Sequence, residues 1–130
     1  MWAVTHPLVG TWSSNNTGFS YTSNEDVSIT LNDGGYGQVE YSRIGGYREI
    51  TQLTWQVPGE GVLELSYRDG PTTPDGAPLL GEAGGAPTRV SYRIAEEDTH
   101  FNGRIPILRI DPPIMMHDEF GPKYFSSRRR

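Results

Sequence analysis

The chain contains no cysteine among its 130 residues. Disulfide bonds, thiolate metal sites and a cysteine nucleophile are therefore excluded. No stretch of the sequence approaches the ~20 apolar residues of a transmembrane helix, and the first residues do not place a basic region before an apolar run. We therefore expect no membrane partner, and a protein that is cytoplasmic or is a mature form whose signal peptide was removed.

Motifs of several common enzyme classes are also missing from the sequence. The chain has no P-loop, no dinucleotide-binding glycine pattern after a strand, no Gly-x-Ser-x-Gly and no His-Glu-x-x-His. The formal net charge is -5, which argues against nucleic acid as a partner. We expect no cofactor, and either a monomer or a homodimer.

Glycine, proline and aromatic residues are abundant instead. The 16 glycines and 10 prolines predict many turns and few long helices. The 3 Trp, 7 Tyr and 4 Phe side chains add apolar area to a chain that is only 35% hydrophobic. The length suits one domain that can bury a core, and we expect residues 1–130 to form a single β-barrel domain.

Apolar and polar residues alternate with the period of a β-strand through most of the chain. Val27, Ile29 and Leu31 alternate with polar residues, and the four residues 32–35 (Asn-Asp-Gly-Gly) then predict a hairpin turn. Together with the segment around residues 8–12, about eight strands are expected, which predicts an all-β, antiparallel, up-and-down closed barrel. The later strands are expected over residues 36–43, 49–57, 62–68, 88–96, 104–110 and 124–127.

Three segments interrupt this alternation. Residues 69–87 are rich in glycine and proline, and we expect a flexible loop within the domain. Residues 96–98 (Glu-Glu-Asp) predict a charged turn, and residues 111–113 (Asp-Pro-Pro) are expected to end a strand. Residues 114–120 are expected to form a short helical turn or an irregular segment.

Gly10-Thr11-Trp12 lies on the first expected strand, after Leu8 and Val9. Alternation places Gly10 and Trp12 on one face, where glycine allows a close backbone approach and the indole can plug a small barrel. This G-x-W arrangement resembles the first strand of the lipocalins and their relatives, the calycin group. The resemblance implies an up-and-down barrel that binds small apolar molecules, with Trp12 closing one end. It also implies a basic side chain over the indole, supplied by Lys123 or one of Arg128–Arg130.

Aromatic and aliphatic side chains on the apolar faces of the strands are the candidate ligand-binding residues. An apolar interior with a few hydroxyl groups would suit a small hydrophobic or aromatic ligand, although such side chains also fill ordinary cores. Arg43 has the parity of Val39 and Tyr41, so it could pair with an anionic ligand group or reach water at the barrel rim. The candidate lining residues are Tyr41, Arg43, Leu53, Trp55, Leu65, Tyr67 and Tyr92.

Catalytic candidates are few. His100 follows an acidic segment, and His117-Asp118-Glu119 is the densest polar cluster, so these four residues are candidates for acid–base chemistry. Adjacent residues of a strand point to opposite faces, so one metal ion is not expected to take all three residues of the cluster. His6 is expected to be an exposed residue near the N-terminus.

Three functions remain open from the sequence. The first is binding of a small hydrophobic or aromatic molecule in a lipocalin-like barrel, beneath the loop at residues 69–87. The second is a cyclase or isomerase on the same scaffold, which would need positioning more than a recognisable catalytic motif. The third is a protein-interaction module whose barrel is filled by its own side chains.

Overall fold

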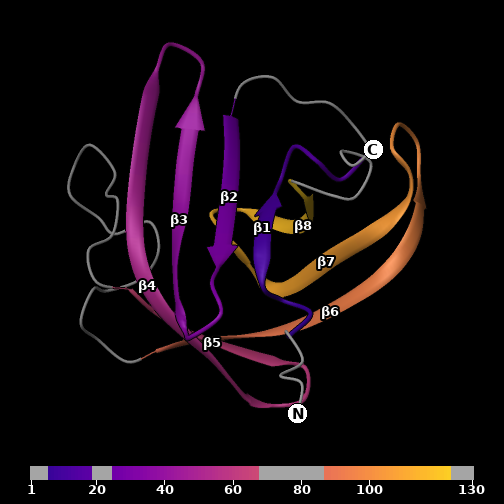
Figure 1. The fold of residues 1–130 in the computed structure, drawn as a ribbon. Helices are drawn as coiled ribbons and strands as arrows, with labels where there is room; N and C mark the ends of the chain where they lie inside the picture. Colours follow the sequence, from indigo (N-terminus) through magenta and orange to yellow (C-terminus); the bar gives the residue numbers. More distant parts are fainter. Residues whose placement is uncertain (1–5, 19–24, 68–86, 124–130) are drawn as a thin grey trace.

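A computed structural model describes residues 6–18, 25–67 and 87–123, and these residues form eight antiparallel β-strands and no helix. Each strand pairs with the next in the chain, and β8 pairs with β1, so the sheet closes into a barrel (Figure 1). The predicted fold class is therefore confirmed. The strands are β1 (Gly10–Ser13), β2 (Glu25–Leu31), β3 (Tyr36–Arg43), β4 (Tyr47–Gly59), β5 (Val62–Tyr67), β6 (Thr88–Thr99), β7 (Gly103–Ile114) and β8 (His117–Pro122).

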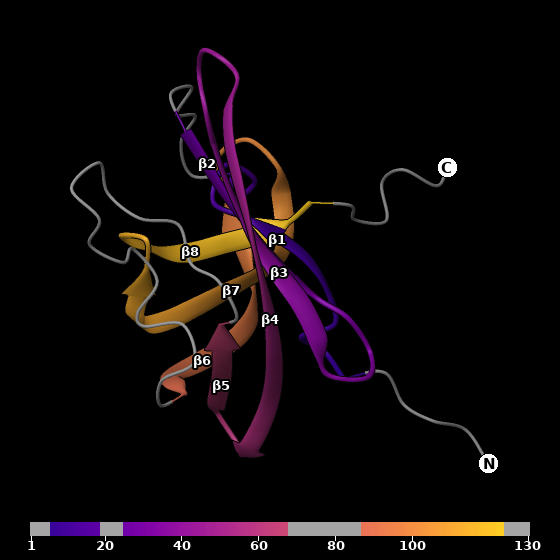
Figure 2. The same cartoon turned by 90° about the vertical axis from the view of Figure 1, so that its left-hand side faces the viewer.

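The strands are strongly coiled around one apolar core. In Figure 1, β2, β3 and β4 run side by side, while β6 and β7 form a long curved hairpin on the other side of the molecule. The view turned by 90° shows how far the strand direction rotates between these two groups (Figure 2). Alternation sends one face of each strand inward, so the interior collects residues such as Val27, Ile29, Val39, Leu53 and Phe120, all at most 2% exposed.

Three strands extend further than the sequence predicted, and the first of them, β4, adds two residues at each end of the expected 49–57. β6 runs through residues 96–98 to Thr99, because these acidic residues continue the ladder with β7 and Asp98 forms an ion pair with Arg104 across it. The turn after β6 lies at residues 100–102 instead. β7 continues through residues 111–113 to Ile114, with Asp111 paired to Ser91 of β6.

The segment at residues 114–120 is also not the expected helical turn or irregular stretch. It contains a tight turn at Met115 and Met116, with φ angles of 49° and 72°, followed by most of β8. Two-residue hairpin turns with positive φ normally carry glycine or asparagine, so a Met-Met sequence gave no signal for this turn. The strand expected at residues 124–127 lies outside the described residues.

Trp12 lies inside the barrel, as expected for a plugging side chain. It is 5% exposed and belongs to the core cluster, and its indole Nε1 donates to the carbonyl oxygen of Leu8 at 3.0 Å. Gly10 has a φ of 141°, and a Cβ on it would meet no atom within 4 Å. The sequence predicted that Gly10 allows a close approach of another element. The structure shows instead that glycine is favoured here by its backbone conformation.

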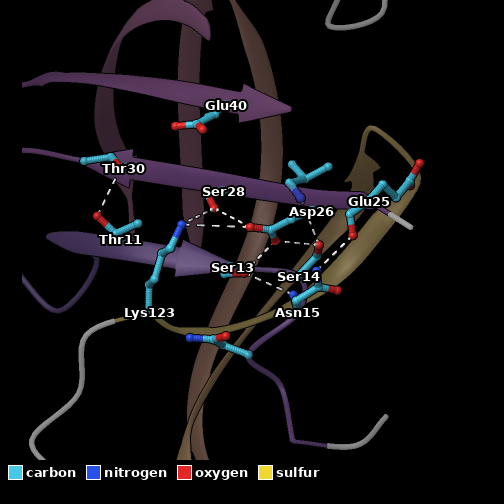
Figure 3. Close-up of polar contacts among 12 residues, drawn as sticks. Thr11, Ser13, Ser14, Asn15, Glu25, Asp26, Ser28, Thr30, Glu40 and Lys123 are labelled. Carbon is cyan, nitrogen blue, oxygen red and sulfur yellow. Dashed lines mark hydrogen bonds and ion pairs between the residues drawn. The ribbon is translucent and has the colours of Figure 1, made fainter. Parts of the chain in front are cut away.

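A polar network on the outer face joins β1 to β2 (Figure 3). Asp26 accepts hydrogen bonds from the hydroxyl groups of Ser13 at 2.6 Å and Ser28 at 3.0 Å. The ammonium group of Lys123 lies 3.4 Å from the Ser28 hydroxyl and 3.9 Å from the Asp26 carboxylate. These contacts connect β1 and β2 to Lys123, the residue that follows β8, at the place where the barrel closes.

The resemblance implied that Lys123 could cover the indole of Trp12, and this prediction is wrong. Trp12 pairs with Pro122 in the ladder between β1 and β8, and alternation turns the next residue, Lys123, to the outer face. Arg128–Arg130, the other candidates for this role, lie outside the described residues.

The segment that follows β1 crosses the outer face of β8 at Gly121. A Cβ on Gly121 would overlap the backbone oxygen of Asn16 and lie 3.1 Å from Cα of Thr17. The segment then reaches the turn between β6 and β7, where the carbonyl oxygen of Gly18 accepts from the backbone amide of Phe101 at 2.8 Å. The absence of a side chain at Gly121 thus lets this segment lie directly on the barrel wall.

We expect Gly121→Ala to lower the free energy of unfolding by about 1–3 kcal/mol, because the new methyl group would push against backbone that cannot rotate away. Gly59→Ala is the matched control. A Cβ on Gly59 meets open space, so its effect should stay within about 0.5 kcal/mol. Urea unfolding of the two variants measures both values, and equal losses would contradict the close approach at Gly121.

Candidate ligand site at one end of the barrel

The two ends of the barrel differ in chemistry. At the end where β1 begins, Leu8 is fully buried, and the His6 ring lies 6.0 Å from the ring of Trp55 and 6.4 Å from that of Tyr92. His6 Nδ1 also accepts from the backbone amide of Leu8 at 3.1 Å. We call this end, with His6, Leu8, Trp55 and Tyr92, the plugged end. His6 is partly buried there and is not the exposed residue that the sequence predicted, because the chain before β1 folds against the barrel.

At the opposite end, polar side chains occupy positions that alternation directs inward. Glu25 has the parity of Val27 on β2, and Glu49 has the parity of the buried Thr51 and Leu53 on β4. The ladder pairs Glu25 with Arg43 and Arg43 with Tyr47, while the next inward layer pairs Tyr41 with Glu49. We call this group the polar end, and it consists of Glu25, Tyr41, Arg43, Tyr47, Glu49 and His117.

Glu25 is the centre of one half of the polar end. Its Oε2 accepts from the Tyr41 hydroxyl at 3.0 Å, and its Oε1 lies 3.1 Å from Nε2 of His117, a residue 92 positions away in the sequence. An ionised carboxylate only accepts, so His117 Nε2 is the donor in this pair. The hydrogen bond from His117 holds the pKa of Glu25 below its usual value, with Tyr41 acting in the same direction and partial burial acting against both.

Two tyrosines connect Glu25 to Glu49. The rings of Tyr41 and Tyr47 meet edge to face with centroids 5.9 Å apart, and the Arg43 guanidinium lies 4.8 Å from the centroid of the Tyr47 ring. The Tyr47 hydroxyl donates to Oε1 of Glu49. Desolvation followed by the bond to Glu25 raises the pKa of Tyr41, and the bond to Glu49 is the main cause that raises the pKa of Tyr47.

The second carboxylate oxygen of Glu49 has no such partner. Among the described residues, Glu49 Oε2 is the buried side-chain oxygen or nitrogen that lacks a hydrogen bond. Leaving a buried acceptor unpaired is unfavourable, typically by about 1–3 kcal/mol. The sequence contained no signal for this atom, because Glu49 was read as the start of a strand and not as a site residue.

The predicted lining residues are distributed over the whole length of the barrel. Tyr41 and Arg43 lie at the polar end, whereas Trp55 and Tyr92 contact His6 at the plugged end. The Arg43 side chain is exposed, in agreement with a position at the rim. The remaining three, Leu53, Leu65 and Tyr67, are buried in the core cluster.

The four catalytic candidates do not form one cluster. His100 is exposed in the turn after β6, where its ring packs on Phe101. Asp118 is exposed, and Glu119 forms an ion pair with Arg109 at 2.5 Å. Only His117 meets a carboxylate at the polar end, and that carboxylate is Glu25 rather than either of its chain neighbours. Within residues 6–18, 25–67 and 87–123, no three His, Asp or Glu side chains are grouped to hold a metal ion.

Two surface depressions lie away from the polar end. One of about 370 Å³ lies between the β2–β3 turn and the outer faces of β4 and β5, with Tyr36, Trp55 and Glu64 in its wall. Glu64 is already bonded there by Gln56 and by Arg89, the latter at 2.7 Å. The other, of about 200 Å³, lies beside Tyr92 and Arg109.

Comparison of the chain with protein-family models, with curated proteins and with solved structures gives no match. The described part of the chain also contains no helix with the length and hydropathy needed to cross a membrane.

We expect the Glu25–His117 contact to stabilise the fold in a pH-dependent way. Because the folded pKa of Glu25 is lowered, its contribution is present above the ordinary value of 4.5 and is lost as the pH falls through the folded pKa. The difference in the free energy of unfolding between the native chain and Glu25→Gln should therefore shrink as the pH falls below 4.5. Urea unfolding at a series of pH values measures it, and Asp118→Asn, which alters an exposed carboxylate, should show no comparable trend.

We also expect the hydroxyl group of Tyr67 to lose its proton at a higher pH than that of an exposed tyrosine. Burial raises the pKa of Tyr67 from 10.0 to about 12, so its stabilising contribution is complete below pH 10 and is lost as the pH rises from 10 to about 12. The free energy of unfolding of the native chain should fall more steeply over this range than that of Tyr67→Phe. Tyr36→Phe changes a side chain that is 68% exposed and should behave like the native chain.

Proposed function

We propose that this protein binds a small hydrophobic or aromatic molecule inside its barrel, in the manner of a lipocalin-like protein, and that the ligand enters through the polar end. The observation that carries the proposal is the difference between the two ends. One end is plugged by apolar and aromatic side chains, and at the other end the inward positions are polar.

The chemistry of the interior supports an apolar ligand. Between the two ends the wall consists of aliphatic and aromatic side chains such as Val27, Val39 and Leu53. Ligand sites in proteins usually combine such a wall with a few polar groups that fix the orientation of the ligand. At the polar end the hydroxyl groups of Tyr41 and Tyr47 and the carboxylates of Glu25 and Glu49 would be these groups.

A neutral fluorescent dye, N-phenyl-1-naphthylamine, tests the proposal. We expect saturable binding with one dye per chain and a rise in fluorescence, because the dye would leave water for an apolar interior. Amide chemical shifts of the native chain, measured by NMR during the titration, should change most at Val27, Tyr41 and Leu53.

The control positions for this experiment lie on the outer face. Shifts confined to Thr54, Gln56 and Ser66, which line the larger surface depression, would contradict binding inside the barrel. The absence of saturable binding would favour the interaction module with a filled barrel.

The Glu25–His117 pair favours a second candidate function, an enzyme that moves a proton on a small apolar substrate. A carboxylate that holds Nε2 of an imidazole fixes the tautomer and leaves Nδ1 as the basic atom. His117 would then be the acid–base group and Glu25 a positioning residue, as in the cyclase or isomerase considered above. To distinguish the two functions, a carbonyl ligand is incubated with the protein in D₂O and recovered. Its mass spectrum reports deuterium taken up from the solvent and its NMR spectrum reports isomerisation, and only the enzyme would cause either change.

A further inference from the structure

We infer that the unpartnered Oε2 of Glu49 is the anchoring point for a ligand's amino group, so that the molecule bound in the barrel carries an amine on an apolar body. This inference rests on the proposed function and adds the class of ligand. It begins from the one described buried side-chain atom whose hydrogen bond is missing.

Neighbouring carboxylates are satisfied by the protein itself. Glu25 uses one oxygen for Tyr41 and the other for His117, and Asp26 on the outer face accepts from Ser13 and Ser28. Glu49 has one oxygen bonded to Tyr47 and the other buried without a donor. Buried acceptors normally find a donor, so the unpaired Oε2 of Glu49 suits a donor brought by a ligand.

The position of Glu49 fits a ligand that enters from the polar end. Glu49 pairs with Tyr41 in the ladder between β3 and β4, one inward layer below Arg43 and Tyr47. Its side chain lies on the inward face of β4, two residues before the buried Thr51. A ligand with its apolar body among the core residues could therefore place a polar head beside Glu49.

The surrounding groups favour a cation over an anion. An ammonium group can donate to Oε2 of Glu49 and lie near tyrosine rings, and the guanidinium of Arg43 at 4.8 Å from the Tyr47 centroid shows that this ring accepts a cation. A carboxylate head would instead face the charges of Glu25 and Glu49. Arg43 offsets part of this repulsion, because its charge helps to lower the pKa of Glu25, but its guanidinium lies at the exposed rim over the ring of Tyr47.

Three molecules with the same apolar chain test the inference: decylamine, decan-1-ol and decanoate, each below its micellar concentration and at physiological salt. Calorimetric titration should rank their affinities amine first, alcohol second and carboxylate last. Glu49→Gln should weaken decylamine binding about tenfold or more, the usual effect of a lost charge-assisted hydrogen bond, and change decanol binding little.

The matched control is Glu40→Gln. It makes the same change in net charge on the outer face of β3, where Glu40 forms an ion pair with Arg48 at 2.7 Å (Figure 3 shows Glu40 on this face). Its decylamine affinity should equal that of the native chain. Glu49→Gln should unfold at the same temperature as the native chain or higher, since the substitution removes a charge whose second oxygen has no donor and keeps an oxygen that can accept from Tyr47.

The outcomes separate the two proposals. If none of the three molecules binds, the proposed function fails and the ligand class fails with it. If decanoate binds as well as decylamine, or if Glu40→Gln weakens decylamine as much as Glu49→Gln does, the barrel binds ligands but the inference about Glu49 is wrong. Should Glu49→Gln not fold, NMR of the native chain with decylamine decides, because the amide shifts of Tyr47 and Glu49 must change with the amine and not with decanoate.

Discussion

Closure of the barrel between its first and last strands is the constraint on which the rest of this structure depends. In the described part of the chain β1 and β8 pair at Trp12 with Pro122 and at Ser13 with Gly121, and the backbone amide of Lys123 donates to the carbonyl oxygen of Thr11 at 2.8 Å, so this seam is short. The indole of Trp12 supports the seam from inside, where it packs in the core, and the Asp26 network with Lys123 supports it from outside. The absence of a side chain at Gly121 allows the segment that follows β1, with Asn16 and Thr17, to lie across the seam. Without closure, the unpaired edges of β1 and β8 would be exposed.

Closure also creates two ends from strands that follow one pattern. Every strand alternates, but the residues at the inward positions change along the barrel from aliphatic and aromatic to charged and hydroxylic. His6 and Leu8 complete the apolar end because the chain before β1 turns back onto it. At the other end Glu25 and Glu49 occupy the same inward faces as Val27 and Leu53. The two ends of the barrel therefore differ in chemistry, one being apolar and aromatic and the other polar.

The polar end is a connected network with one gap. Hydrogen bonds and ring contacts lead from His117 through Glu25, Tyr41 and Tyr47 to Glu49, and the network stops at the free oxygen Oε2. Buried polar networks are stable when every member is satisfied, and an unsatisfied member is unfavourable in a low dielectric. The unpaired oxygen of Glu49 is therefore the unfavourable point in the described part of this network.

The fold class could be predicted from the sequence alone, because the alternation of apolar residues and the turn residues between them act locally. Trp12 was placed in the interior on the same grounds. The sequence also led to errors where local signals compete with the ladder, as at residues 96–98 and 111–113, since cross-strand pairing carries a strand through charged and proline residues. Three features arise only in the folded barrel: the contact of His117 with Glu25, the position of His6 at one end, and the unpaired oxygen of Glu49. These facts depend on register and closure, which bring together residues far apart in the chain, and no local pattern encodes them.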